Sequence, residues 1–114
     1  MFRDKKILLL LLILWSFPVY AHNDNSPPQL WSWFEDLDVS KKECRNESLN
    51  ALETLRIRNI VQNQHGTYGT FRSNRVVVKC LKLKKNKSKL WVAVAGPVAS
   101  SVESLRNKII NQIK

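Results

Sequence analysis

Residues 75–95, RVVVKCLKLKKNKSKLWVAVA, decide the fold that we predict for this chain of 114 residues. In both halves of the stretch, successive side chains would point to opposite faces of a strand, and a polar turn at Asn86-Lys87-Ser88 lies between them. The residues expected on the buried face are Val76, Val78 and Cys80 before the turn and Leu90, Val92 and Val94 after it. The stretch therefore predicts a β-hairpin built from two strands, Arg75 to Leu83 and Leu90 to Ala95.

A one-sided helix is predicted on each side of this hairpin. Ser40 and Glu43 match the S-x-x-E capping box, which satisfies free backbone N–H groups at a helix start. Cys44 then begins a series of residues at helical spacing, which predicts a helix from Lys41 to about Arg56. After the break at Gly96-Pro97, steps of three and four predict a terminal helix with one apolar stripe. The stripe consists of Val98, Val102, Leu105, Ile109 and Ile113.

The remaining segments have weaker patterns. Ile57 to Gln62 is rich in β-branched residues and predicts a strand, and His65-Gly66 with the nearby Gly69 predicts a turn or bend. The aromatic segment 30–37 has apolar residues at i, i+3, i+4 and i+7, which predict a short helix that covers the core. Those residues are Leu30, Trp33, Phe34 and Leu37. The alternative is an exposed aromatic patch for a partner or a membrane surface.

The predicted order is therefore helix, strand, strand, strand, helix. A sheet with one apolar face needs a cover, and two helices with one apolar stripe each supply it. We predict an α+β fold, a two-layer sandwich with an antiparallel sheet, over residues 40–114. Residues 22–39 form an N-terminal lead that contains the aromatic segment.

The first 21 residues have the pattern of a signal peptide. Arg3, Lys5 and Lys6 precede the apolar run Ile7 to Trp15, and Val19 and Ala21 occupy the positions that a signal peptidase reads. A retained membrane anchor is the alternative, but the apolar stretch is shorter than the roughly 20 residues that a span needs. We expect cleavage before His22, a mature chain with no stable membrane span, and a secreted or periplasmic location.

The chain has two cysteines, Cys44 and Cys80, and both lie on predicted inner faces. In an exported protein they are expected to form one disulfide between the first helix and the sheet. Closing that loop would stabilise the fold by roughly 3–4 kcal/mol. Two buried thiols, or a redox or metal pair, are the alternatives, although no C-x-x-C spacing is present.

The charges are strongly segregated. The chain has 19 Lys and Arg against 9 Asp and Glu, a net charge of +10, and residues 54–114 contain a single acid, Glu103. Eight basic residues and no acid lie between residues 72 and 89: Arg72, Arg75, Lys79, Lys82, Lys84, Lys85, Lys87 and Lys89. Such a cluster raises the local potential and attracts anionic partners. A solvated sheet face protected by lysine at its edge is the other interpretation.

The partner of this cluster is not expected to be a specific nucleic-acid sequence. Only Trp91 and Phe71 lie near it as stacking residues, and lysine outnumbers arginine, which favours diffuse attraction over bidentate recognition. We predict an exported binding protein whose basic hairpin contacts an anionic surface. The alternative is a periplasmic inhibitor or immunity-type protein that docks onto an acidic target enzyme.

No enzyme chemistry, metal or cofactor is predicted. Glu103 is the only acid after the first helix, and His22 and His65 are the only histidines. A copper site formed by the new N-terminus at His22 together with His65 is a minor alternative. Asn46 and Asn86 each begin an N-x-S triplet, which matters only where asparagine is glycosylated.

Four short features along the chain resemble small exported bacterial proteins of unassigned function. They are a cysteine on an early helix, Gly66-Thr67-Tyr68 before a strand, Val78-Lys79-Cys80 within it, and Val94-Ala95-Gly96-Pro97 before the last helix. The resemblance covers about Cys44 to Ile113. It implies paired cysteines and a two-layer fold, and it implies no activity.

Overall fold

The computed structural model describes residues 26–114. The predicted signal peptide, residues 1–21, and the start of the lead, including His22, lie outside the described residues. The elements are β1 (Gln29–Leu37), α2 (Lys41–Thr54), β2 (Arg58–Asn63), β3 (Gly66–Phe71), β4 (Asn74–Lys84), β5 (Lys87–Gly96) and α3 (Ala99–Ile113).

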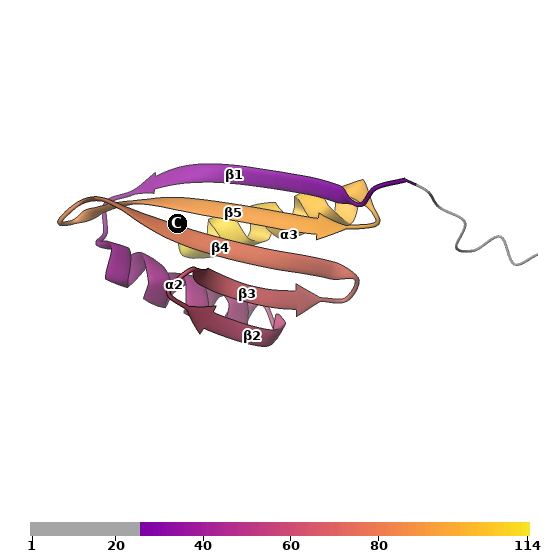
Figure 1. The fold of residues 1–114 in the computed structure, drawn as a ribbon, viewed down its shortest axis with the longest axis horizontal. Coiled ribbons are helices and arrows are strands. Elements are labelled where there is room, and N and C mark those ends of the chain that lie inside the picture. The colour runs from indigo at the N-terminus through magenta and orange to yellow at the C-terminus, as the bar shows by residue number, and fades with distance from the viewer. Residues whose placement is uncertain (1–25) are drawn as a thin grey trace, which may run out of the picture.

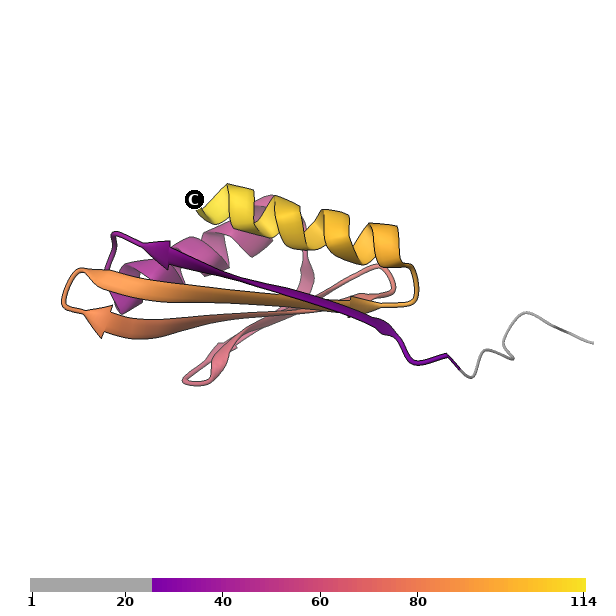
Figure 2. The same ribbon diagram turned by 90° about the horizontal axis from the view of Figure 1, so that it is seen from above.

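The strands form one antiparallel sheet in the order β1-β5-β4-β3-β2. Both helices lie on the same side of this sheet, which leaves its other face uncovered (Figures 1 and 2). The predicted α+β class, the two layers and the antiparallel sheet are confirmed. The sheet, however, has five strands, where the sequence patterns predicted three.

The central hairpin is present with the predicted faces, but its turn consists of Lys85 and Asn86, because Lys87 and Ser88 already belong to β5. Val76 pairs with Val94 and Val78 with Val92, and all four side chains are buried beneath the helices. Leu90 is fully enclosed in the same layer. The alternation that predicted the hairpin thus also placed the centre of the core.

The aromatic segment is a strand, so the prediction of a short helix there is wrong. β1 pairs along its whole length with β5, from Gln29 opposite Gly96 to Leu37 opposite Ser88. An unpaired edge of β5 would leave a row of buried or half-buried backbone N–H and C=O groups without partners, and β1 supplies those partners. Trp31 and Leu37 pack against the core, whereas Leu30 and Phe34 are exposed.

A second strand, β3, lies where the glycines predicted only a turn or bend. Its Gly69 packs directly beneath Ile57, and a Cβ at that position would overlap the Ile57 Cγ2. The glycine therefore allows the segment at Ile57 to approach β3 closely, which is a known use of glycine in sheets. The turn itself is formed by Gln64 and His65, between β2 and β3.

Helix α2 begins and ends as its sequence dictates. The Ser40 side chain accepts a hydrogen bond from the Glu43 N–H (3.1 Å), which confirms the predicted cap. At the other end the Ile57 N–H donates to Leu52 O (2.9 Å), and Arg56, at φ 61°, has the left-handed conformation of a Schellman motif. Leu52 and Ile57 are both buried, so the two residues that this hydrogen bond joins also belong to the core.

The disulfide between Cys44 and Cys80 is present, and it joins α2 to β4 as predicted. Cys44 is fully buried and Cys80 nearly so.

Helix α3 buries Val102, Leu105, Ile109 and Ile113, and also Ile110. Val98, the first residue of the predicted stripe, is 52% exposed because the helix begins only after it.

Candidate anion-binding surface

The eight predicted basic residues do not form one patch. Arg72 lies in the turn between β3 and β4, and Arg75 is near the start of β4. Lys82, Lys84 and Lys85 lie at the far end of that strand, roughly 30 Å away at 3.3 Å per residue. Figure 1 shows the two ends on opposite sides of the molecule. The structure therefore brings five lysines, Lys82, Lys84, Lys85, Lys87 and Lys89, to one end of the hairpin, leaves Lys79 in the middle of β4 opposite Trp91, and separates the two arginines from that end.

The six lysines occupy the β4–β5 hairpin, and two of them are neutralised. Lys87 lies 3.2 Å from an Asp38 oxygen, and Lys89 lies 2.9 Å from an Asp36 oxygen. Both acids come from β1 and the residue that follows it. The sequence, in which eight of the nine acids precede residue 54, could not show this compensation, because it depends on the pairing of β1 with β5.

The other four lysines have no ion pair within residues 26–114. We call Lys79, Lys82, Lys84 and Lys85 the free lysines. Leu81 and Leu83 alternate with them along β4 and are 51% and 47% exposed. This end of the hairpin therefore combines positive charge with exposed apolar side chains.

The uncovered face of the sheet has an aromatic pair beside the lysines. Phe34 and Trp91 face each other across β1 and β5 with ring centroids 6.4 Å apart, and Lys89 Nζ lies 5.8 Å from the Phe34 centroid. The sequence suggested Trp91 and Phe71 as stacking residues. Phe71 instead lies at the other end of the sheet, beneath the Arg72 guanidinium. The pairing partner Phe34 was missed because its segment was predicted to be helical.

Arg106 of α3 covers the outer edge of β1. Its guanidinium carbon lies 5.4 Å from the Trp31 centroid and 5.7 Å from the Trp33 centroid. The same side chain donates a hydrogen bond to Ser32 O (3.2 Å). A cation over two indole rings, together with an occupied edge carbonyl, makes this edge a poor template for another strand.

Next to this cluster, two donors act on the Glu35 carboxylate. The Lys114 ammonium lies 3.2 Å from Glu35 Oε1, and the Trp33 indole N–H donates to the same oxygen. The ammonium, and to a lesser extent the indole, lower the pKa of Glu35 below its usual value. The end of the chain is thereby tied to β1.

We expect Lys114→Gln to raise the pKa of Glu35 back toward that of an ordinary glutamate. Because the folded-state pKa is lowered, the stability that Glu35 contributes is present above the ordinary value and is lost as pH falls through the lowered one. NMR titration of the Glu35 carboxyl carbon measures the shift, with Lys108→Gln on the same helix as the control. An unchanged midpoint in Lys114→Gln would contradict the ion pair.

The residues considered for other chemistry lie apart from this surface. Within residues 26–114, no group of three or more His, Cys, Asp or Glu side chains is placed to hold a metal ion. His65 is exposed in the β2–β3 turn, where its backbone N–H donates to Asn63 Oδ1 (2.8 Å). The other proposed copper ligand, His22, lies outside the described residues. Asn46 is exposed on α2, and Asn86 is exposed in the β4–β5 turn.

No helix in residues 26–114 combines the length and the apolar composition that a membrane crossing requires. In the comparisons with known proteins, no family model and no curated protein matches this chain.

Proposed function

We propose that this chain is an exported, non-enzymatic binding protein that contacts an anionic partner through the β4–β5 hairpin. The observation that carries the proposal is the group of four free lysines within seven consecutive residues, 79–85. The disulfide supports export, since disulfides persist in oxidising compartments. The basic and apolar leader in the sequence points the same way.

The placement of the lysines is unfavourable for the protein alone. Lys84 lies directly opposite Lys87 in the hairpin, and like charges across a strand pair repel each other. Asp38 and Asp36 relieve the repulsion only on the β5 side. An anion that approaches the free lysines would relieve the repulsion on the β4 side. Binding an anionic partner therefore lowers the electrostatic energy of this hairpin more than it would that of a neutral strand pair.

An inhibitor or immunity-type protein that docks onto an acidic target enzyme is the second candidate. The exposed Leu81 and Leu83 favour it, because a diffuse polyanion offers nothing for apolar side chains to pack against. An acidic cleft in a folded protein would contact both the lysines and the leucines. Aromatic and aliphatic anchors inside a charged rim are typical of protein interfaces.

We expect the triple variant Lys82→Gln, Lys84→Gln, Lys85→Gln to bind a heparin fragment about 100-fold more weakly than the wild type at 50 mM salt. Each lysine that neutralises an anionic group releases a counterion, so the salt dependence should also fall by about three in log–log slope. Isothermal titration at several salt concentrations measures both. The control variant Lys41→Gln, Lys42→Gln, Arg58→Gln loses the same charge from exposed side chains outside the hairpin.

Equal losses in the two triple variants would show that only net charge matters, which would contradict a hairpin site. The two candidates are separated by Leu81→Ser, Leu83→Ser. Heparin binding should survive this change. Binding to an acidic enzyme of the compartment to which the protein is exported should be lost, because a protein interface would bury both leucines.

A further inference from the structure

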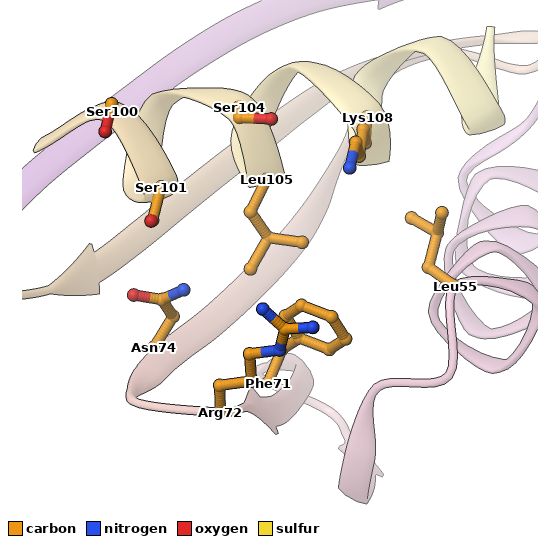
Figure 3. A pocket seen from close by; sticks show the side chains of 9 residues that line it. All are labelled: Leu55, Phe71, Arg72, Asn74, Ser100, Ser101, Ser104, Leu105 and Lys108. Atoms are coloured by element: carbon orange, nitrogen blue, oxygen red, sulfur yellow. The ribbon is translucent and has the colours of Figure 1, made fainter. Parts of the chain in front are cut away.

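A pocket at the opposite end of the sheet has the character of a small-anion site. It lies between the β3–β4 turn and the first turns of α3 and has a volume of about 310 Å³, within the range of small-molecule sites (Figure 3). Arg72 and Lys108 enter it from different elements, and neither forms an ion pair within residues 26–114. None of the described residues that line it is acidic.

A buried amide without a partner faces this pocket. Asn74 is only 6% exposed, and its side chain has no hydrogen bond to any of residues 26–114. Its Oδ1 lies over Gly96, where a Cβ would overlap it, and its Nδ2 points into the pocket (Figure 3). An anion in the pocket would give this amide N–H an acceptor.

The wall formed by α3 supplies further donors. Ser101 and Ser104 line the pocket, and the helix start has neither a side-chain cap nor an acid in its first turn. The free N–H groups and the dipole of a helix start favour negative charge. The floor is apolar, with Leu55, Phe71 and the nearly buried Leu105.

A second pocket of about 590 Å³ adjoins the first and shares Leu55, Phe71 and Arg72 with it. It adds the guanidinium groups of Arg56 and Arg58, again with no acid among the described residues that line it. Arg56 and Arg72 have left-handed backbones, at φ 61° and 55°, where glycine would be unstrained. Arginine therefore dominates this end of the molecule, whereas the basic residues between 79 and 89 are all lysines.

We propose that the pocket binds a small organic phosphate or sulfate monoester. Arg72 and Lys108 neutralise the tetrahedral oxyanion, and Arg72 can donate two parallel hydrogen bonds to it. Asn74 Nδ2 and the Ser101 hydroxyl complete its coordination. The organic body lies against Phe71 and Leu105. This site is independent of the hairpin surface and takes a different class of ligand.

The test is a ¹⁵N–¹H NMR titration of the oxidised protein with phenyl phosphate, phenyl sulfate, inorganic phosphate, phenylacetate and phenol. The first two should shift the amides of Arg72, Asn74 and Ser101 and bind at least 10-fold more tightly than inorganic phosphate, which lacks the apolar body. Phenol should not bind. Tighter binding of the phosphate ester or of the sulfate ester identifies which of the two the site prefers.

The variant Arg72→Gln, Lys108→Gln should weaken phenyl phosphate binding at least 10-fold, because both changes remove charge from exposed side chains without altering the core. Asn74→Asp, which adds a negative charge inside the pocket, should abolish binding. The charge-matched control Lys82→Gln, Lys85→Gln should bind as the wild type does. Phenylacetate binding as tightly as the esters, or shifts confined to the hairpin lysines, would overturn the proposal and leave the hairpin function unaffected.

Discussion

Replacing both cysteines, Cys44→Ala with Cys80→Ala, is expected to lower the free energy of unfolding by about 4 kcal/mol and Tm by about 20 °C. The disulfide closes a loop with a sequence separation of 36, and releasing that loop increases the entropy of the unfolded chain. Both sulfurs are buried between α2 and β4, so their packing contacts are lost as well. In a domain with a small core, few other interactions contribute as much.

Circular dichroism melts of the oxidised wild type, the reduced wild type and the double variant separate the two causes. The reduced wild type keeps both side chains, so its loss of stability reports the cross-link alone. The additional loss in the double variant reports the missing volume. A reduced protein that melts within about 5 °C of the oxidised one would show that the packing of α2 on the sheet, and not the cross-link, holds the two layers together.

The disulfide and the hairpin could be predicted because they depend on local patterns. Alternation in residues 75–95 fixes which side chains face the helices, and helical spacing around Cys44 fixes the face of α2. Two cysteines on inner faces then allow a single pairing. The cap at Ser40 is equally local, because its hydrogen bond spans three residues.

The outer strands could not be predicted in the same way, because distant residues determine their conformation. The spacing of Leu30, Trp33, Phe34 and Leu37 fits a helix, yet a strand forms because the edge of β5 is open to pairing. β3 contains two glycines and looks like a bend until Ile57 is seen packed over Gly69. In both cases tertiary contacts override a weak local preference.

The grouping of the basic residues and the position of the pocket likewise depend on contacts between distant residues. The eight basic residues from Arg72 to Lys89 are close in sequence, but the length of β4 divides them between two ends of the molecule. The acids that neutralise Lys87 and Lys89 come from a segment some fifty residues earlier. The pocket around Asn74 is lined by α3, the residue after α2, the adjoining ends of β3 and β4 and the turn between them, and no sequence motif marks it.

Ile109→Ala and Val98→Ala test how α3 packs on the sheet, since both residues belong to one apolar stripe in the sequence. Ile109 is fully buried, so removing three carbons leaves a cavity, and we expect a loss of about 3 kcal/mol, or a Tm lower by about 15 °C. Val98 is 52% exposed and precedes the helix, so its truncation should change stability by less than about 0.5 kcal/mol.

Urea unfolding of the two variants, followed by tryptophan fluorescence, gives both free energies from one experiment. The comparison is decisive because sequence periodicity predicts equal losses of unfolding free energy in the two variants. The observed start of α3 at Ala99 instead predicts losses that differ several-fold. Similar losses in the two variants would mean that the helix begins earlier in solution and packs Val98 against the core. In that case the helix start would not face the pocket between α3 and the β3–β4 turn, and the anion site proposed there would lose one of its walls.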